Sequence, residues 1–150
     1  MKQTIMVKYL TKMALYLGNK RMNDMYYTIG QVAKMQHLTI SQIRYYDKQG
    51  LFPFLQRNEK GDRVFDEEAL KYLEMILCLK NTGMPIQKIK QFIDWSMEGE
   101  STILQRLELM KQQETNVLQL IQDTEKNLKK IQQKIAKYEN EITSANAIKK

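Results

Sequence analysis

A heptad pattern in the last third of the chain constrains its fold more than any other feature. Apolar residues recur at alternating steps of four and three between residues 103 and 142. Ten of the twelve seam positions are apolar, and no proline or glycine interrupts them. A seam this narrow and regular is typical of a coiled coil. The apolar positions are Ile103, Leu107, Met110, Val117, Ile121, Leu128, Ile131, Ile135, Tyr138 and Ile142.

The predicted helix needs a partner for its seam. It would be on the order of 60 Å long, too long for a small domain to cover. The rest of the sequence contains no comparable second helix. The pattern therefore predicts a homodimer. The two polar seam positions, Glu114 and Thr124, either tune the register or mark where another element packs. Residues 143–150 are predicted to be a frayed tail.

Length and charge limit the class of protein. A chain of 150 residues predicts one domain, or a small domain with an extension. No apolar run approaches the roughly 20 residues of a membrane span. The net charge is +7, and residues 34–63 carry six cations against three anions, which suits a nucleic-acid surface. The single cysteine, Cys78, excludes an intrachain disulfide and indicates a reducing compartment.

Residues 1–24 are predicted to be a dispensable extension. Lys8 and Lys12 interrupt its apolar stretch and no cleavage site follows, which argues against a signal peptide. Two explanations remain open: an amphipathic surface helix, or a start codon assigned too early. Met22 and Met25 are the alternative starts.

Two capping boxes stand eleven residues apart in the next segment. Thr28 precedes Gln31, and Thr39 precedes Gln42, each with the spacing at which a hydroxyl and an amide cap a helix start reciprocally. Two helices this close predict a helix-turn-helix. His37 lies in the turn, where a left-handed backbone is expected.

The second of these helices carries an unusual side-chain set. Arg44 and Lys48 are four residues apart and share a face, which Tyr45 and Tyr46 flank. Such a helix offers cations and hydroxyls to phosphates, and a guanidinium fork to a guanine edge. The alternative is an ordinary amphipathic helix with buried tyrosine rings.

Residues 55–65 predict a hairpin, with Gly61 in its turn. Arg57, Lys60 and Arg63 line this hairpin, so it suits a wing against a phosphate backbone. A polar turn with solvated charges is the alternative.

Two further helices are predicted before the long one. Asp66 should cap a helix that continues to about Lys80, with a buried stripe of Leu70, Leu73 and Leu77 and with Ile76 beside it. Gly83 should stop that helix. Pro85 should begin the next one, which carries Trp95 near its end.

The order of these segments resembles the MerR family of bacterial transcription regulators. T-I-G-Q-V-A is followed by S-Q-I-R-Y-Y-D-K-Q-G-L-F-P, R-N-E-K-G-D-R-V-F-D, G-M-P-I-Q-K-I and one long helix. The resemblance covers residues 26–142. It implies a mainly α fold, with a winged helix-turn-helix domain at 25–98 and an antiparallel coiled-coil dimerisation helix at 99–142.

The resemblance also implies a function and partners. Family members bind double-stranded promoter DNA as homodimers, at a pseudo-palindrome within an unusually long spacer. An effector then makes the dimer kink and untwist the DNA, so that RNA polymerase can use the promoter, an indirect partnership. The expected location is the bacterial cytoplasm, in association with the nucleoid. No membrane contact, cofactor or bound metal is expected.

Residue roles follow from the matching motifs. The helix that starts at Thr39 and ends near Lys48 should enter the major groove. Base-edge contacts are expected from Ser41, Gln42 and Arg44, while Tyr45 and Tyr46 should touch phosphates or brace the helix. The wing residues are Arg57, Lys60 and Arg63. Phe65 departs from the family's usual tyrosine.

The sequence constrains the identity of the effector less than any other part of the expected function. Residues 79–150 contain no Cys or His, which argues against the thiolate metal sites of some members. Cys78 resembles the lone cysteine of the aldehyde- and electrophile-responsive branch. Its alternative is an inert core thiol. Another possibility is a hydrophobic effector in an apolar pocket formed by Tyr72, Met84, Trp95 and Met97.

Two classes of function remain open on the sequence alone. The favoured class is a signal-responsive transcription regulator. The alternative is a coiled-coil architectural protein or constitutive repressor that binds DNA without an effector. The sequence offers no nucleophile–base pair, metal-ligand cluster or phosphate loop, so no enzyme activity is expected.

Overall fold

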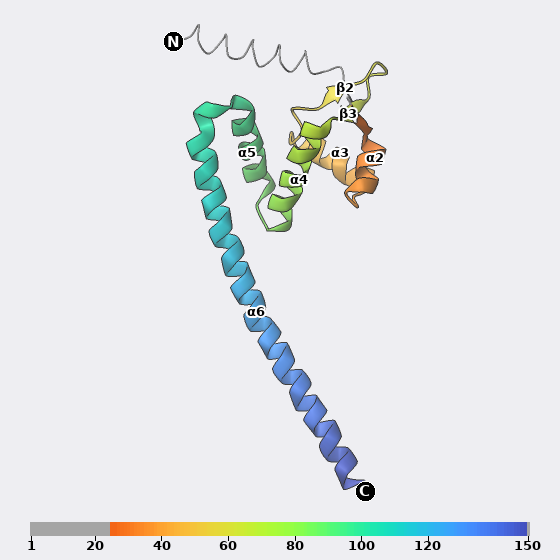
Figure 1. The fold of residues 1–150 in the computed structure, drawn as a ribbon, viewed down its shortest axis with the longest axis vertical. Helices are drawn as coiled ribbons and strands as arrows, with labels where there is room; N and C mark the ends of the chain where they lie inside the picture. The colour runs from red at the N-terminus through yellow and green to blue at the C-terminus, as the bar shows by residue number, and fades with distance from the viewer. Residues whose placement is uncertain (1–24, 150) are drawn as a thin grey trace. The chain divides into compact units, whose positions relative to one another are not determined.

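The computed structural model describes residues 25–149, which divide into two compact units that join at Asn81 and Thr82 (Figure 1). The fold is mainly α, as predicted. The extension at 1–24 lies outside the described residues. Within the described part of the chain, no helix is long and apolar enough to cross a membrane.

The first unit consists of short helices around a small sheet. Its elements are β1 (Tyr27–Thr28), α2 (Ile29–Met35), α3 (Ile40–Lys48), β2 (Gln56–Arg57), β3 (Arg63–Phe65) and α4 (Glu67–Asn81). The helix-turn-helix and the hairpin are where the sequence predicted them. Asp66 caps α4 as expected, since its Oδ1 accepts a hydrogen bond of 2.8 Å from the Ala69 amide.

The sheet has one strand that the sequence did not reveal. Its order is β1-β3-β2, with both pairings antiparallel. Tyr27 pairs with Phe65, and Arg57 pairs with Arg63. A strand of two residues carries no alternation pattern, which is why β1 escaped prediction. It ties the start of the described chain to the hairpin and places α2 directly after the sheet.

An aromatic cluster forms the centre of the first unit. Phe52 makes edge-on contacts with Tyr46 at 6.4 Å and with Phe65 at 5.6 Å between ring centroids. These three rings are almost completely buried. Phe65 therefore serves the core, where a phenol would have needed a hydrogen-bond partner.

The buried side of α4 differs from the predicted stripe. Leu73 and Ile76 are fully buried, together with Ala69 and Leu79, whereas Leu70 and Leu77 are only half-buried. At about 100° per residue, Leu70 and Leu77 lie roughly 50° from the direction of Leu73. The i, i+3, i+7 spacing of the three leucines identified the buried side of the helix but not the centre of that side.

The second unit is built on one long helix. It contains α5 (Ile86–Glu98), a 3₁₀ turn η1 (Glu100–Thr102) and α6 (Ile103–Ile148). The predicted domain boundary lay at residue 98. In the structure α5 packs against α6 and belongs to this unit. The predicted tail at 143–150 is wrong for residues 143–148, which continue α6 because no glycine or proline breaks them.

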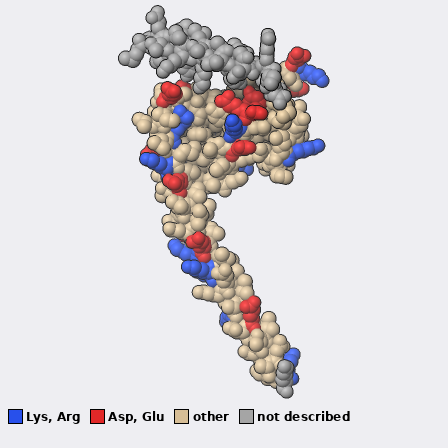
Figure 2. Space-filling view, viewed as in Figure 1, with Lys and Arg blue, Asp and Glu red and all other residues tan. Residues whose placement is uncertain are grey.

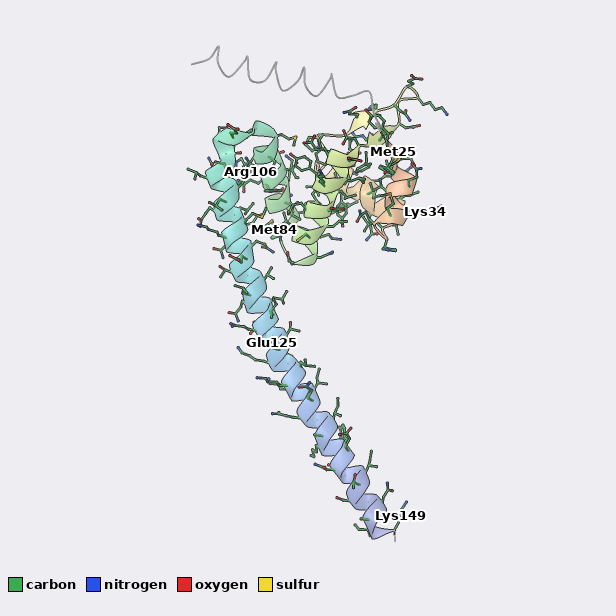
Figure 3. The ribbon with its side chains drawn as sticks, viewed as in Figure 1. Met25, Lys34, Met84, Arg106, Glu125 and Lys149 are labelled. Carbon is green, nitrogen blue, oxygen red and sulfur yellow. The ribbon has the colours of Figure 1, made fainter. Side chains whose placement is uncertain are left out.

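A polar network joins α5 to the start of α6. The buried Thr102 hydroxyl lies within hydrogen-bond distance of the Trp95 and Gly99 carbonyls. Arg106, labelled in Figure 3, donates to the Thr102 hydroxyl at 3.2 Å and to the Gly99 carbonyl at 3.0 Å. The turn is thereby held by side chains whose polar groups are satisfied, as burial demands.

A second polar contact anchors α6 further along. Gln113 is buried, and its amide nitrogen donates to the Thr82 carbonyl at 3.1 Å and to the Thr82 hydroxyl at 2.9 Å. Beyond Gln113, almost every described side chain of α6 is exposed. The helix continues for roughly 50 Å from there to its end.

Candidate DNA-binding surface

The two capping boxes fix the start of each helix of the helix-turn-helix. The Gln31 backbone N–H donates to the Thr28 hydroxyl at 3.2 Å, and the Gln31 side-chain oxygen accepts from the Thr28 backbone N–H at 2.8 Å. Thr39 and Gln42 repeat this pair of bonds at 3.1 and 2.8 Å. His37 stands between them with φ 54°, the left-handed conformation expected for the turn. Both helix starts are therefore set by local chemistry.

The rotation of α3 is fixed by two buried side chains. Ile43 and Tyr46 are 0% and 1% exposed. At about 100° per residue, the opposite face carries four polar residues, which are all exposed. These are Ser41, Arg44, Tyr45 and Lys48. The structure thus brings together four of the predicted contact residues on one outward surface, called here the reading face.

The cations of the reading face are available to a ligand. Neither Arg44 nor Lys48 has an ion-pair or hydrogen-bond partner among the described side chains. A guanidinium that has no bidentate partner within the protein can present both of its terminal nitrogens to a base edge or a phosphate. This is the electrostatic arrangement that a groove-reading helix requires.

Gln42 and Thr39 form the capping box that the sequence predicted, and a base contact by Gln42 stays a prediction. The Gln42 amide oxygen accepts from the Thr39 amide nitrogen at 2.8 Å, so the capping box already uses it. The Thr39 hydroxyl accepts in turn from the Gln42 backbone. Both residues position the helix that bears the reading face, and their capping function is the role that the geometry supports.

Tyr46 belongs to the core and not to the reading face. Its hydroxyl is buried and has no hydrogen-bond partner among the described residues. The Lys80 ammonium lies 5.1 Å from its ring centroid, a cation–π distance. Of the two roles expected for this tyrosine, phosphate contact or bracing, only bracing fits this position.

Removing the Tyr46 hydroxyl should therefore do no harm. We expect Tyr46→Phe to leave the free energy of unfolding unchanged or to raise it by up to about 1 kcal/mol, because an unpaired buried hydroxyl is lost. Urea unfolding at a fixed protein concentration would measure the change. Tyr45→Phe, at a side chain that is 50% exposed, is the matched control and should not alter stability. A loss above about 1 kcal/mol for Tyr46→Phe would reveal a hydrogen bond.

The wing is a tight hairpin organised by Asn58. Its side-chain oxygen accepts from the amides of Lys60 and Asp62 at 3.0 and 2.9 Å. Gly61 has φ 82°, a conformation that a side chain would strain. The turn chemistry predicted from the sequence is thus present, and it holds the tip between β2 and β3 in one shape.

The three wing cations have different environments. Arg57 donates to the Gly61 carbonyl at 2.7 Å, which closes the hairpin. Arg63 forms an ion pair with Asp47 near the end of α3. Lys60 is exposed at the tip, and its ammonium has no partner among the described residues. Arg57 and Arg63 make contacts within the first unit, while Lys60 is the clearest candidate for a phosphate contact.

Truncating Lys60 should weaken binding to every DNA sequence alike. For Lys60→Ala, each lost phosphate contact should reduce the slope of log K against log salt by about 0.9. Titrating operator and non-operator duplexes over a range of salt concentrations would measure both quantities. A changed sequence preference at constant salt slope would contradict the assignment. Glu59→Gln, at the neighbouring exposed anion, is the control and should not lower affinity.

Cys78 lies on the exposed side of α4. The alternative of a core thiol therefore does not fit, because the residue points away from the Leu73 and Ile76 direction, and the reactivity of the thiol stays a prediction. No group of described residues has the composition of a metal site. Of the residues expected to hold a hydrophobic effector, Tyr72 stacks on Phe54 with 4.8 Å between ring centroids, and Met84 is buried within its own unit.

Comparisons with known proteins agree on one family. Residues 27–94 match the model described as MerR HTH family regulatory protein. An uncharacterized HTH-type transcriptional regulator of Haemophilus influenzae is 36% identical over 77% of this chain and 85% of its own length. The Bacillus subtilis regulator AdhR is 33% identical over 61% of this chain and 65% of its own.

Solved structures give the same result. A MerR family transcriptional regulator from Bacillus thuringiensis is 95% identical over 75% of this chain and 99% of that chain, with a TM-score of 0.73. HiNmlR, described as a MerR family regulator lacking the sensor domain and bound to promoter DNA, is 36% identical. It covers 77% of this chain and 92% of its own, with a TM-score of 0.74.

Proposed function

Because the chain belongs to the MerR family of helix-turn-helix regulators, we propose that it binds a promoter spacer as a homodimer and controls initiation by distorting the DNA. The chain is a transcriptional regulator, and its relatives are not enzymes. The observation that carries the DNA-binding proposal is the reading face, where Arg44 and Lys48 are exposed and unengaged on a helix whose rotation is fixed.

The proposed homodimer rests on the seam of α6. The seam residues lie on one continuous helix, and those from Ile121 onward are about half exposed or more in the single chain. Burying a large aliphatic side chain contributes roughly 1.5–3 kcal/mol, so an uncovered stripe of this length favours association strongly. The resemblance to the family supports an antiparallel pair. Two subunits then carry two reading faces, which suits a pseudo-palindrome.

Promoter binding is supported by a relative of similar length. HiNmlR, which is bound to promoter DNA in its crystal structure, shares 36% of residues with this chain. The wing and the reading face lie in the segment that matches the family model. We therefore place the operator between the −35 and −10 elements of a promoter, where deformation of the spacer would act on initiation.

Footprinting tests this function. Genomic fragments selected with the full chain would be treated with DNase I in the presence and absence of protein. Protection confined to a spacer, with enhanced cleavage near its centre, is the expected result, because a kink exposes the minor groove. Even, sequence-independent protection along the fragment would instead show an architectural DNA-binding protein. A dimer that protects the spacer equally in every condition would be a constitutive repressor.

We place the signal at Cys78, where an electrophile or oxidant could reach the thiol. Its exposure on α4 supports this role. Thiol modification changes the size and polarity of a side chain on the unit that binds DNA. An effector held in an apolar pocket remains the second possibility for the signal.

Replacing the thiol should remove the response. A reporter strain carrying Cys78→Ser is expected to lose induction by aldehydes, quinones and peroxide, while operator binding in vitro stays within about twofold of wild type. Met75→Leu is the matched control, because Met75 is an exposed sulfur residue three positions away on the same helix. Equal induction of wild type and Cys78→Ser would exclude the thiol as the sensor.

A further inference from the structure

A run of lysines on α6 is not used by any part of the proposed function. Residues 126–137 contain five lysines and no Asp or Glu, so this stretch carries a formal charge of +5. Every member is exposed. The lysines, called here the basic stripe, are Lys126, Lys129, Lys130, Lys134 and Lys137. Figure 2 shows basic side chains grouped along one side of this helix.

The basic stripe lies on the opposite side of α6 from the seam. At about 100° per residue, its mean direction is roughly 160° from that of Leu128, Ile135 and Ile142. A second copy of the chain that covers the seam would leave the stripe in solvent. The inference therefore rests on the proposed dimer, and each dimer would carry two such stripes.

The centre of the stripe has no internal counter-charge. Lys126 approaches Asp123 at 3.4 Å and Lys137 approaches Glu141 at 3.7 Å, both as exposed pairs at the ends of the stripe. The Lys134 ammonium lies 5.1 Å from the Tyr138 ring centroid. Lys129 and Lys130 have no partner among the described residues. Exposed pairs of this kind hold their lysines only weakly, so an external anion can recruit all five.

The composition around the stripe favours phosphate over protein. The residues interleaved with the lysines on this side are Gln133 and Ala136, and the flanking positions are Gln122, Asp123, Asn140 and Glu141. A protein interface is usually centred on aromatic, Met or Arg anchors and is depleted of lysine. A membrane-bound helix would need apolar residues beside its cations, but those belong to the seam. A group of lysines without aromatic, Met or Arg residues among them suits a phosphate backbone, because phosphates are bound by single positive charges and require no pocket.

We propose that the basic stripe binds the phosphate backbone of a DNA duplex other than the operator. The stripe extends roughly 16 Å along the helix axis. A duplex of that length presents about ten phosphates. Because the phosphates outnumber the five lysines, each lysine can reach a phosphate without a precise alignment of helix and duplex. A dimer on its operator would thereby hold a second segment of DNA, without regard to sequence.

A capture experiment tests the proposal. Operator duplex on beads would be saturated with the full-length protein, and a labelled duplex without operator sequence would then be added. We expect wild type to retain the labelled duplex, and Lys129→Gln/Lys130→Gln/Lys134→Gln to retain at least tenfold less. Glutamine keeps helix propensity and removes charge. The matched control, Lys88→Gln/Lys111→Gln/Lys149→Gln, removes equal charge outside the stripe and should behave as wild type.

The outcomes separate the stripe from the operator site. Protein retained on operator beads reports the proposed function, and the labelled duplex reports the stripe. Equal capture of the labelled duplex by the triple variant and wild type would overturn the proposal. Tighter capture of poly-glutamate than of DNA would also overturn it, because that result would indicate an acidic protein partner. In solution, the salt slope for non-operator DNA should fall by up to about 3 in the triple variant. An unchanged slope would overturn the proposal even if no operator is found.

Discussion

Leu128→Glu is expected to convert the dimer into monomers and to abolish tight operator binding. Leu128 occupies a seam position and is 51% exposed in the single chain. In a coiled coil it would insert between side chains of the partner helix. Two unpaired carboxylates per dimer would then be buried at a cost of several kcal/mol, which raises the dimer dissociation constant by about 100-fold or more.

The measurement needs both association and DNA binding. Sedimentation equilibrium would give the dissociation constant, and circular dichroism would show whether α6 stays helical. Gln122→Glu adds the same charge on the outer side of α6 and should leave the dimer intact. A Leu128→Glu protein that remains dimeric would show that the seam is not the dimer interface, and that another surface joins the subunits.

Arg44→Ala should produce the largest loss of sequence discrimination. A bidentate contact between arginine and a guanine is worth about 1–3 kcal/mol, and a dimer makes the contact twice. We therefore expect operator affinity to fall by between roughly thirtyfold and ten-thousandfold. Non-operator affinity should fall much less, since only one charge is lost at each reading face.

The chemistry of the contact can be separated from its charge. Arg44→Lys keeps the cation but removes the planar fork, so it should recover non-operator binding without recovering discrimination. Fluorescence anisotropy with operator and mutated-operator duplexes at one salt concentration would measure both. Full recovery by lysine would mean that Arg44 meets a phosphate and that another residue of the reading face reads the bases.

Features of the fold that depend on neighbouring residues were predictable from the sequence. The capping boxes at Thr28 and Thr39 are confirmed with their hydrogen bonds. The left-handed turn at His37 is also confirmed. Each depends on side chains within four positions of one another, so local patterns contain the needed information.

Features that depend on tertiary contacts were not predictable. Tyr45 and Tyr46 are adjacent and identical in type, yet one is half exposed and the other is buried. The ion pair of Arg63 with Asp47 joins residues sixteen positions apart. No local pattern reveals that this arginine forms an ion pair within the first unit, and a DNA contact by Arg63 stays a prediction.

The buried polar residues of the second unit were not predicted from the sequence, for a related reason. Gln113 and Thr102 are among the least exposed residues of the second unit. Polar residues lie at the surface in most proteins, and a pattern of apolar positions cannot reveal the exceptions. Their hydrogen bonds to Thr82, Trp95 and Gly99 become visible only when the turn before α6 is in place.

The ion pair between Arg63 and Asp47 has a mechanical consequence. It links the strand that supports the wing to the end of the reading helix, so helix and wing present one stiff template. When a stiff template meets a flexible duplex, the duplex adopts the shape of the template and bears most of the elastic energy. Promoters whose spacers contain easily deformed base-pair steps would then be occupied first. The choice of target would depend on the deformability of the spacer as well as on its base sequence.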